Sequence, residues 1–138
     1  MSQLVLDDQL KASHVLQPLR KWITVQRLRD LRLHQLILDD RVPQILWTLK
    51  QPTFVTIDHG FWKKTFCHPD YANLVFSLRD DQQVHLPGLL RALLQRPGFR
   101  TRKNRMGKVA RISTTAIDYW EFSRTQLQHF DWKSKRSR

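Results

Sequence analysis

The sequence is poor in cysteine and in long hydrophobic runs, and each scarcity excludes a class of protein. Cys67 is the only cysteine among the 138 residues, which excludes an internal disulfide framework and a multi-cysteine metal site. No apolar run approaches the roughly 18 to 20 residues that a membrane-spanning helix needs, so no membrane partner is expected. The first residues also lack the basic segment of a secretory signal. We therefore expect a protein of the reducing cytoplasm.

Glutamate is scarce among the acidic residues. Glu121 is the only glutamate among the 12 acidic side chains, and the others are aspartates. Glutamate is the better helix former, so a protein that uses carboxylates mainly on helix surfaces favours it over aspartate. Several of the aspartates here follow a predicted strand or precede a predicted helix. At such positions a carboxylate caps a helix, forms a turn or binds a metal ion.

Basic residues are abundant and are concentrated in the second part of the chain. The sequence has 24 Lys and Arg residues against 12 Asp and Glu, a net charge of +12. Residues 1–81 carry 11 basic and 9 acidic side chains, whereas residues 82–138 carry 13 and 3. A field of one sign suits a polyanion, and nucleic acid is the commonest one. We therefore favour nucleic acid over the lipid surfaces that also attract basic proteins.

The pattern of hydrophobic residues predicts alternating strands and helices in one domain. The length and the hydrophobic content of 41% suffice for one continuous core. A leucine stripe predicts an amphipathic helix that ends before Pro97 and Gly98, and Pro18 is expected to kink or shorten the first helix. Strands are predicted at 3–7, 23–25, 54–58, 72–78 and 109–117, and helices from residue 10, at 40–49 and at 86–94. Residues 1–122 form the predicted domain, and 123–138 a mobile basic tail.

This order of elements predicts an α/β fold with a mostly parallel central sheet flanked by helices. In such sheets the functional groups collect beyond the carboxyl ends of the strands. Asp7 and Asp58 both stand at a predicted strand end, Asp8 follows Asp7, and Asp40 stands at a predicted helix start. We therefore expect these four aspartates to converge at one edge of the sheet.

Closely spaced carboxylates repel one another unless a cation neutralises them. Oxygen ligands favour a hard ion such as Mg²⁺ or Mn²⁺, which can activate a water for phosphodiester hydrolysis. Each aspartate also has a simpler interpretation. Asp40 can be a helix N-cap, Asp8 can turn the chain after the first strand, and Asp58 before His59 and Gly60 can form a turn.

Two segments resemble the PIN-like family, which includes the VapC-type toxin ribonucleases. LVLDDQL resembles the first-strand pattern LLLDENL, and DRVPQILWTLKQPTFVTID resembles the family's second block, with an acidic helix start before a strand that ends in Asp. A later stretch, HPDYANLVFSLRDDQQVHLPGLLRALLQRP, also resembles a PIN-like subfamily, and the resemblance extends over about residues 3–120. It implies a three-layer sandwich in which Asp7, Asp40 and Asp58 are catalytic and bind Mg²⁺ or Mn²⁺, with Asp8 at the place of a frequent glutamate. It also implies an antitoxin partner and, frequently, a homodimer.

One position departs from the family pattern. The family commonly has Asp-x-Asp-Phe after the third strand, where this chain has Asp58-His59-Gly60-Phe61. The missing second carboxylate puts a second metal site, or the activity itself, in doubt. A binding protein descended from a nuclease therefore remains an open alternative.

The segment from Arg100 to Arg111 is rich in cations. It holds six basic residues in twelve positions without an acid, and these are Arg100, Arg102, Lys103, Arg105, Lys108 and Arg111. They are predicted to contact RNA phosphates. The simpler interpretation is a solvated loop between a helix and the last strand. Of the five tryptophans, Trp62 is the one predicted to stack on a base, because it lies near Asp58.

Three other functions compete with a metal-dependent endoribonuclease that acts as a toxin. A phosphoacceptor receiver domain also has an Asp pair after its first strand. Such domains resemble one another in a Lys-Pro pair after the last strand, which this chain lacks. They are also usually acidic, whereas this chain is basic. A catalytically inactive, basic RNA- or ribosome-binding protein would keep RNA affinity without needing a divalent ion. An antitoxin-like or scaffold protein is supported only by the basic tail.

Overall fold

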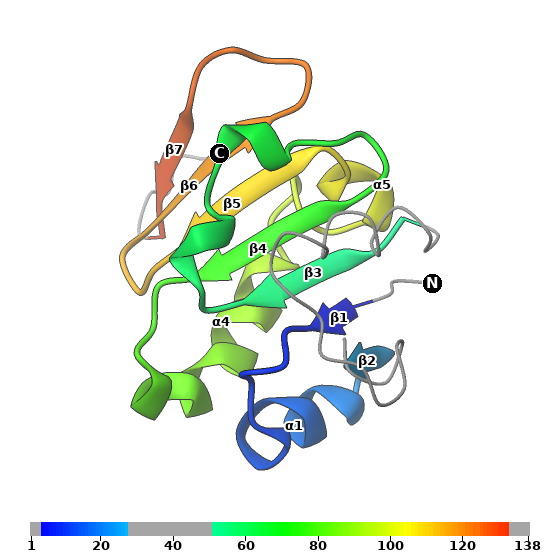
Figure 1. Cartoon of the computed structure of the whole chain (residues 1–138), viewed down its shortest axis with the longest axis vertical. Helices are drawn as coiled ribbons and strands as arrows, with labels where there is room; N and C mark the ends of the chain where they lie inside the picture. The colour runs from blue at the N-terminus through cyan, green and yellow to red at the C-terminus, as the bar shows by residue number, and fades with distance from the viewer. Residues whose placement is uncertain (1–3, 28–50, 133–138) are drawn as a thin grey trace.

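The computed structural model describes residues 4–27 and 51–132, which form one seven-stranded sheet with helices on it (Figure 1). The strand order is β2-β1-β3-β4-β5-β6-β7. The strands are β1 (Leu4–Leu6), β2 (Val25–Arg27), β3 (Thr53–Thr56), β4 (Ala72–Phe76), β5 (Lys108–Ile112), β6 (Ala116–Glu121) and β7 (Gln128–Asp131). β1 to β5 pair in parallel, and β6 and β7 are antiparallel additions at one side. The predicted fold class, α/β with a mostly parallel sheet, is confirmed.

The helical segments are short apart from α4. They are η1 (Ala12–Leu16), α1 (Gln17–Arg20), η3 (His59–Phe61), η4 (Lys64–Phe66), η5 (Asp80–His85), α4 (Leu86–Leu93) and α5 (Arg102–Arg105). Pro18 lies in the first turn of α1, where its missing N–H costs little, and the helical geometry changes there from η1 to α1. No helix in residues 4–27 and 51–132 is long and apolar enough to cross a membrane.

Side chains alternate between the two faces of the sheet, and each face has its own hydrophobic cluster. Leu6, Val55 and Leu74 point to the larger cluster, which also contains leucines of α1 and α4, and we call this side the helical face. Val5 and Phe54 point to the other side, where Phe61, Tyr71 and Val75 complete the smaller cluster. We call it the aromatic face. Figure 1 shows η3 and η4 on the near, aromatic face and α4 behind the sheet.

Two predicted boundaries are wrong for local reasons. Residues 109–117, predicted as one strand, form the two antiparallel strands β5 and β6. The Ser113 hydroxyl accepts hydrogen bonds from the backbone N–H groups of Thr115 and Ala116, and this turn reverses the chain. The second strand begins at Val25 rather than at Ile23, because the N–H of Ile23 still donates to the Leu19 carbonyl at the end of α1.

The predicted tail is also wrong in part. Within 123–138, residues 128–131 form β7, which pairs with β6 and places Phe130 opposite Ile117. Phe130 and Trp132 pack against the core of the helical face, and the Trp132 indole N–H donates to the Ser113 carbonyl. The domain therefore continues at least to Trp132. The predicted helix at 40–49 lies outside the described residues.

Candidate active site

The parallel pairing of β1 and β3 brings two of the predicted aspartates to one edge of the sheet. Leu6 is in register with Val55, so the residues that follow both strands emerge at the same carboxyl edge. The N–H of Asp7 continues the ladder by donating to the Val55 carbonyl over 2.9 Å. Asp7 and Asp58 therefore both lie at the carboxyl edge of the sheet, where the functional groups of parallel sheets collect.

Asp7 is a buried carboxylate that is held by three donors. Its exposed fraction is only 8%. Its Oδ2 atom accepts hydrogen bonds from the Thr56 hydroxyl at 2.6 Å and from the Gln9 amide at 3.2 Å, and its Oδ1 accepts from the Asp8 N–H at 2.7 Å. Burial raises the pKa of Asp7 above its ordinary value, and the donated hydrogen bonds offset only part of this shift. The charged form therefore lacks full compensation among its described neighbours.

The Thr56 hydroxyl connects the two aspartates. It donates to Asp7 and accepts from the backbone N–H of Asp58 at 2.9 Å. Sequence analysis missed Thr56 as a site residue. The available signal was the spacing Thr56-Ile57-Asp58, because residues two apart at a strand end lie on the same side of the chain. A threonine that precedes a strand-end aspartate by two is therefore placed to hold a neighbouring carboxylate.

Asp58 forms a turn, which was the simpler interpretation of this residue. The turn uses only one of the two carboxylate oxygens. Its Oδ1 accepts a hydrogen bond from the Gly60 N–H at 2.8 Å and so caps η3. Within residues 4–27 and 51–132, its Oδ2 makes no hydrogen bond. Capping fixes the orientation of the carboxylate, and a fixed oxygen is what a metal ligand requires.

Gly60 stands where the PIN-like pattern has its second acid, and its surroundings show what a side chain would meet there. A Cβ at this position would lie 3.1 Å from Oδ1 of Asp58. The Asp58 carboxylate would have to shift, or the hydrogen bond that caps η3 would be strained. In this chain the glycine therefore keeps Asp58 in its capping geometry.

The described residues supply only part of the predicted metal site. They contain no group of three or more potential ligands, so Asp8 does not complete a set with Asp7 and Asp58. Asp40 lies outside the described residues. Asp7 and Asp58 fit a hard cation by chemistry, since both offer carboxylate oxygens and one carboxylate is buried without full charge compensation. Binding would require at least one further ligand.

The predicted phosphate-binding segment begins at the opposite edge of the sheet. α5 and the loop before it precede β5, so they lie at the amino ends of the parallel strands. Two predicted members of this segment have structural roles, and the prediction of phosphate contact is wrong for them. Arg105 is fully buried, and its guanidinium donates to the Thr53 hydroxyl and to the carbonyls of Phe99 and Arg100.

Lys108 is the second of the two. Its ammonium donates to the carbonyls of Gly98 and Asn104 and lies over the ring of Phe99. Only 7% of the residue is exposed, and burial lowers its pKa. A cation enclosed in this way cannot also reach a phosphate. Arg100 and Lys103 are exposed and Arg102 is partly exposed, and for these three phosphate contact stays a prediction.

Arg111 is the one predicted cation whose neighbours connect it to the carboxyl edge. Its guanidinium lies 5.1 Å from the ring centroid of Trp62, which follows η3 and is four residues after Asp58. It also forms an ion pair with Asp118 at 3.1 Å, while 39% of its side chain remains exposed. Arg111 is thus placed on the aromatic face near the segment that Asp58 caps.

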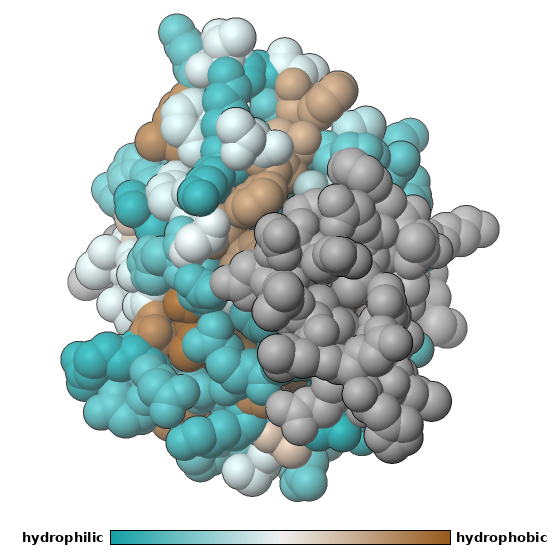
Figure 2. Space-filling view, viewed as in Figure 1, coloured by the Kyte–Doolittle hydropathy of each residue, from teal (hydrophilic) through white to brown (hydrophobic). Residues whose placement is uncertain are grey.

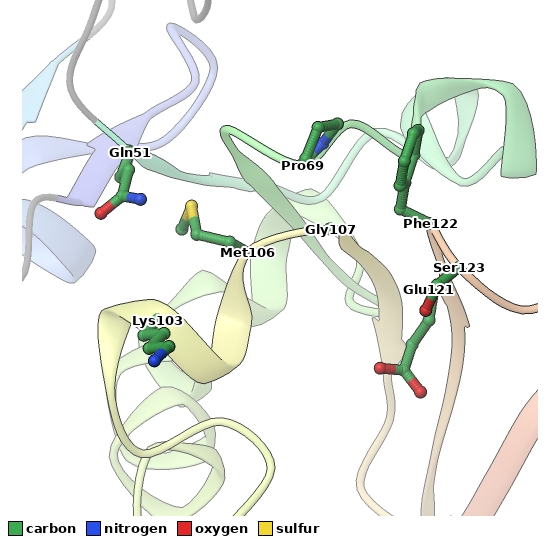
Figure 3. Close-up of a pocket in the computed structure, with 8 residues that line it drawn as sticks. All are labelled: Gln51, Pro69, Lys103, Met106, Gly107, Glu121, Phe122 and Ser123. Atoms are coloured by element: carbon green, nitrogen blue, oxygen red, sulfur yellow. The ribbon is translucent and has the colours of Figure 1, made fainter.

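A pocket of about 320 Å³ lies at the amino edge, away from the two aspartates (Figure 3). Segments that precede β3, β4 and β5 and the end of β6 form its walls. Its lining residues are Gln51, Pro69, Lys103, Met106, Gly107, Glu121, Phe122 and Ser123. Gly107 adopts a φ of 86°, which favours glycine, and so lets the chain turn from α5 into β5.

Comparison with family models, with curated proteins and with solved structures finds no match to this chain. The resemblance to the PIN-like family therefore rests on the short motifs around Asp7 and Asp58.

Proposed function

We propose that this protein is a metal-dependent endoribonuclease whose active site lies at the carboxyl edge of β1 and β3. The observation that carries the proposal is the Thr56 hydroxyl, which donates to the Asp7 carboxylate and accepts from the Asp58 N–H. It ties two aspartates from distant parts of the sequence to one position. The role of toxin in a toxin–antitoxin pair, with an antitoxin as partner, is supported by the motif resemblance alone.

Asp7 and Asp58 would hold a Mg²⁺ or Mn²⁺ ion, with Asp40 as the ligand that the motifs suggest. When bound, such an ion lowers the pKa of a water molecule and stabilises the leaving oxygen of a phosphodiester. The chain's own contribution is to orient the carboxylates. Thr56 and Gln9 fix Asp7, and the cap of η3 fixes Asp58.

The test is RNA cleavage by the Asp58→Asn variant, with Asp70→Asn as its matched control. Asparagine keeps an oxygen that can cap η3 but removes the charge that holds a cation, so the fold and RNA binding are expected to remain. Cleavage in Mg²⁺ or Mn²⁺ should fall by at least about 100-fold, as for loss of a metal ligand. Asp70 is an exposed aspartate with no motif support, and its variant should cleave at the wild-type rate.

Excess EDTA should abolish cleavage by the wild-type protein and by Asp70→Asn alike. Unchanged cleavage in EDTA, or by Asp58→Asn, would eliminate the assignment. Denaturation curves of the variants establish that any loss is not a loss of folding.

Two observations favour a second candidate, a basic RNA-binding protein without catalysis. The family's second strand-end acid is Gly60 here, and residues 4–27 and 51–132 contain no group of three potential metal ligands. Such a protein would bind RNA with an affinity that falls steeply with salt and does not depend on divalent ions. The same assay separates the two functions, because RNA binding without cleavage by the wild-type protein supports only the second.

A further inference from the structure

Two tryptophans meet on the aromatic face of the sheet, beyond the candidate active site. Trp120 projects from β6, and Trp62 follows η3 directly. Their ring centroids are 6.3 Å apart, with an angle of 31° between the ring planes. Both side chains are only partly buried. Each ring therefore keeps part of its surface accessible to a ligand.

A cation lies over each of these rings. The Arg111 guanidinium is 5.1 Å from the centroid of Trp62, and the Lys64 ammonium is 5.7 Å from that of Trp120. Lys64 is exposed, and Arg111 keeps 39% of its side chain accessible. A single cation–ring contact also occurs on the helical face, where Arg91 lies over Trp22. Here two rings and two cations are adjacent, which gives a nucleotide rings for its base and charges for its phosphate.

A third aromatic side chain continues the row toward the amino edge. Phe122 follows β6 and extends its pairing, since its N–H donates to the Gly107 carbonyl. It lies two residues beyond Trp120, which places both side chains on one face roughly 6–7 Å apart. Phe122 is 59% exposed and borders the pocket that contains Lys103 (Figure 3). Figure 2, seen from this side, shows hydrophobic residues bordered by hydrophilic ones in the part that is not grey.

We infer that Trp62, Trp120 and Phe122 form a stacking surface for single-stranded RNA. The occupant follows from charge and shape together. Three cations lie along this row and complement a polyanion: Arg111 over Trp62, Lys64 over Trp120, and Lys103 in the pocket that Phe122 borders. Bases must be unpaired to stack on protein rings, because both faces of a base inside a duplex are already occupied.

This inference deepens the proposed function, on which it rests for the choice of RNA, by making single-stranded RNA the substrate. The row starts at Trp62, four residues after Asp58, and ends beside Lys103. A strand that lies along it would be held on the aromatic face with one end directed to the carboxyl edge. An acidic protein segment is the alternative occupant, and the experiment distinguishes it.

The experiment measures binding of a fluorescent oligouridylate of about ten nucleotides in EDTA, so that no cleavage occurs. Trp62→Leu and Trp120→Leu should each weaken binding about tenfold, as expected for loss of one stacked base. Trp22→Leu is the matched control, since Trp22 packs on the helical face under Arg91, and its binding should equal that of the wild type. A fully paired RNA hairpin of matched charge, kept double-stranded by G·C pairs, should bind at least about tenfold more weakly.

A second pair of variants keeps the test decisive if a tryptophan variant fails to fold. Arg111 and Arg91 each lie 5.1 Å over a tryptophan ring, on opposite faces of the sheet. Arg111→Ala should weaken binding several-fold and lower the salt dependence, whereas Arg91→Ala should do neither.

Three results would overturn the inference. These are equal binding by the folded tryptophan variants and the wild type, equal binding of duplex and single strand, and competition by polyglutamate as effective as that by oligouridylate. None of them bears on catalysis. Conversely, loss of cleavage by Asp58→Asn with tight oligouridylate binding leaves the stacking surface intact.

Discussion

The two ends of β3 hold buried charges of opposite sign. A threonine hydroxyl stands at each end, and each binds a buried charged side chain from elsewhere in the chain. At the amino end, Thr53 accepts a hydrogen bond from Nε of Arg105 at 3.0 Å. At the carboxyl end, Thr56 donates to Oδ2 of Asp7 at 2.6 Å. The strand thus holds a buried cation at one edge of the sheet and a buried anion at the other.

The difference between the two ends lies in what else surrounds the charge. Arg105 is enclosed by backbone carbonyls, and burial lowers its pKa to about 10, so it stays charged at neutral pH as a structural clamp. Burial raises the pKa of Asp7 despite its donors, and a second carboxylate, Asp58, stands at the same edge. Burial disfavours the charged form at both ends, so the pKa shifts alone do not separate them. What separates them is that Asp7 stands beside a second carboxylate, whereas Arg105 is surrounded by backbone acceptors.

The largest expected effect on stability comes from removing the Arg105 side chain at the amino edge. Arg105→Ala leaves the Thr53 hydroxyl and two carbonyls without their donor and creates a cavity, so the free energy of unfolding should fall by about 3–5 kcal/mol. Urea denaturation measures this loss. Arg100→Ala is the control, because Arg100 is exposed and its removal should cost less than about 0.5 kcal/mol.

The same pair of variants tests the corrected role of Arg105. At temperatures where it remains folded, Arg105→Ala should leave the salt dependence of RNA binding unchanged, because the side chain cannot reach a phosphate. An Arg105→Ala protein that is as stable as the wild type but binds RNA with a lower salt dependence would restore the original prediction.

Much of the fold was predictable because its signals are local. The β-branched run before Asp58 predicted β3, and the leucine stripe predicted α4 with its end near Leu94. The β5–β6 hairpin was missed because strand-like residues stand on both sides of a short turn. The turn is held by the Ser113 N–H, which donates to the Ala116 carbonyl, and by the Ser113 hydroxyl, and no periodicity reports such contacts.

The candidate site was predictable to the level of the sheet edge and no further. Strand-end positions place Asp7 and Asp58 together in any parallel pairing of their strands, and the structure has that pairing. The charge count of residues 100–111 could not separate exposed cations from enclosed ones. That separation depends on carbonyl acceptors such as those of Phe99 and Gly98, which belong to the loop conformation and carry no sequence signal.

A matched pair of threonine substitutions compares the two ends of β3 directly and is expected to have an intermediate effect on stability. Thr53→Val and Thr56→Val each remove one buried hydroxyl and keep the shape of the side chain, so both should lower the free energy of unfolding by about 1–3 kcal/mol. Their effects on RNA cleavage should differ. Thr56→Val frees the Asp7 carboxylate and should reduce kcat by about 10–100-fold, as for loss of a group that orients a metal ligand.

Cleavage kinetics at saturating RNA provide the measurement, with urea denaturation in parallel. Thr53→Val should retain the wild-type kcat, because Arg105 lies at the opposite edge. Equal losses of kcat in both variants would mean that cleavage follows stability alone, and the functional distinction between the two edges would fail.

The smallest effect has the opposite sign and comes from Asp7→Asn. Folding raises the pKa of this carboxyl above its ordinary 3.8, so the contribution of Asp7 to stability is fully present below pH 3.8 and is lost as the pH rises through the folded-state pKa. Asparagine has no charge to bury, and it can still accept from the Asp8 N–H and meet the Thr56 hydroxyl. At neutral pH and without metal, Asp7→Asn should therefore match or exceed the wild-type stability, by up to roughly 2 kcal/mol.

Urea denaturation between pH 4 and pH 7 checks this, since the wild-type protein should lose stability relative to Asp7→Asn as the pH rises. Added Mg²⁺ or Mn²⁺ should stabilise only the wild type, because a cation supplies the charge compensation that the described neighbours of Asp7 do not. A strongly destabilised Asp7→Asn protein that also lacks this pH trend would show that Asp7 is a structural anion, the counterpart of Arg105. The asymmetry between the two ends of β3 would then carry no information about function.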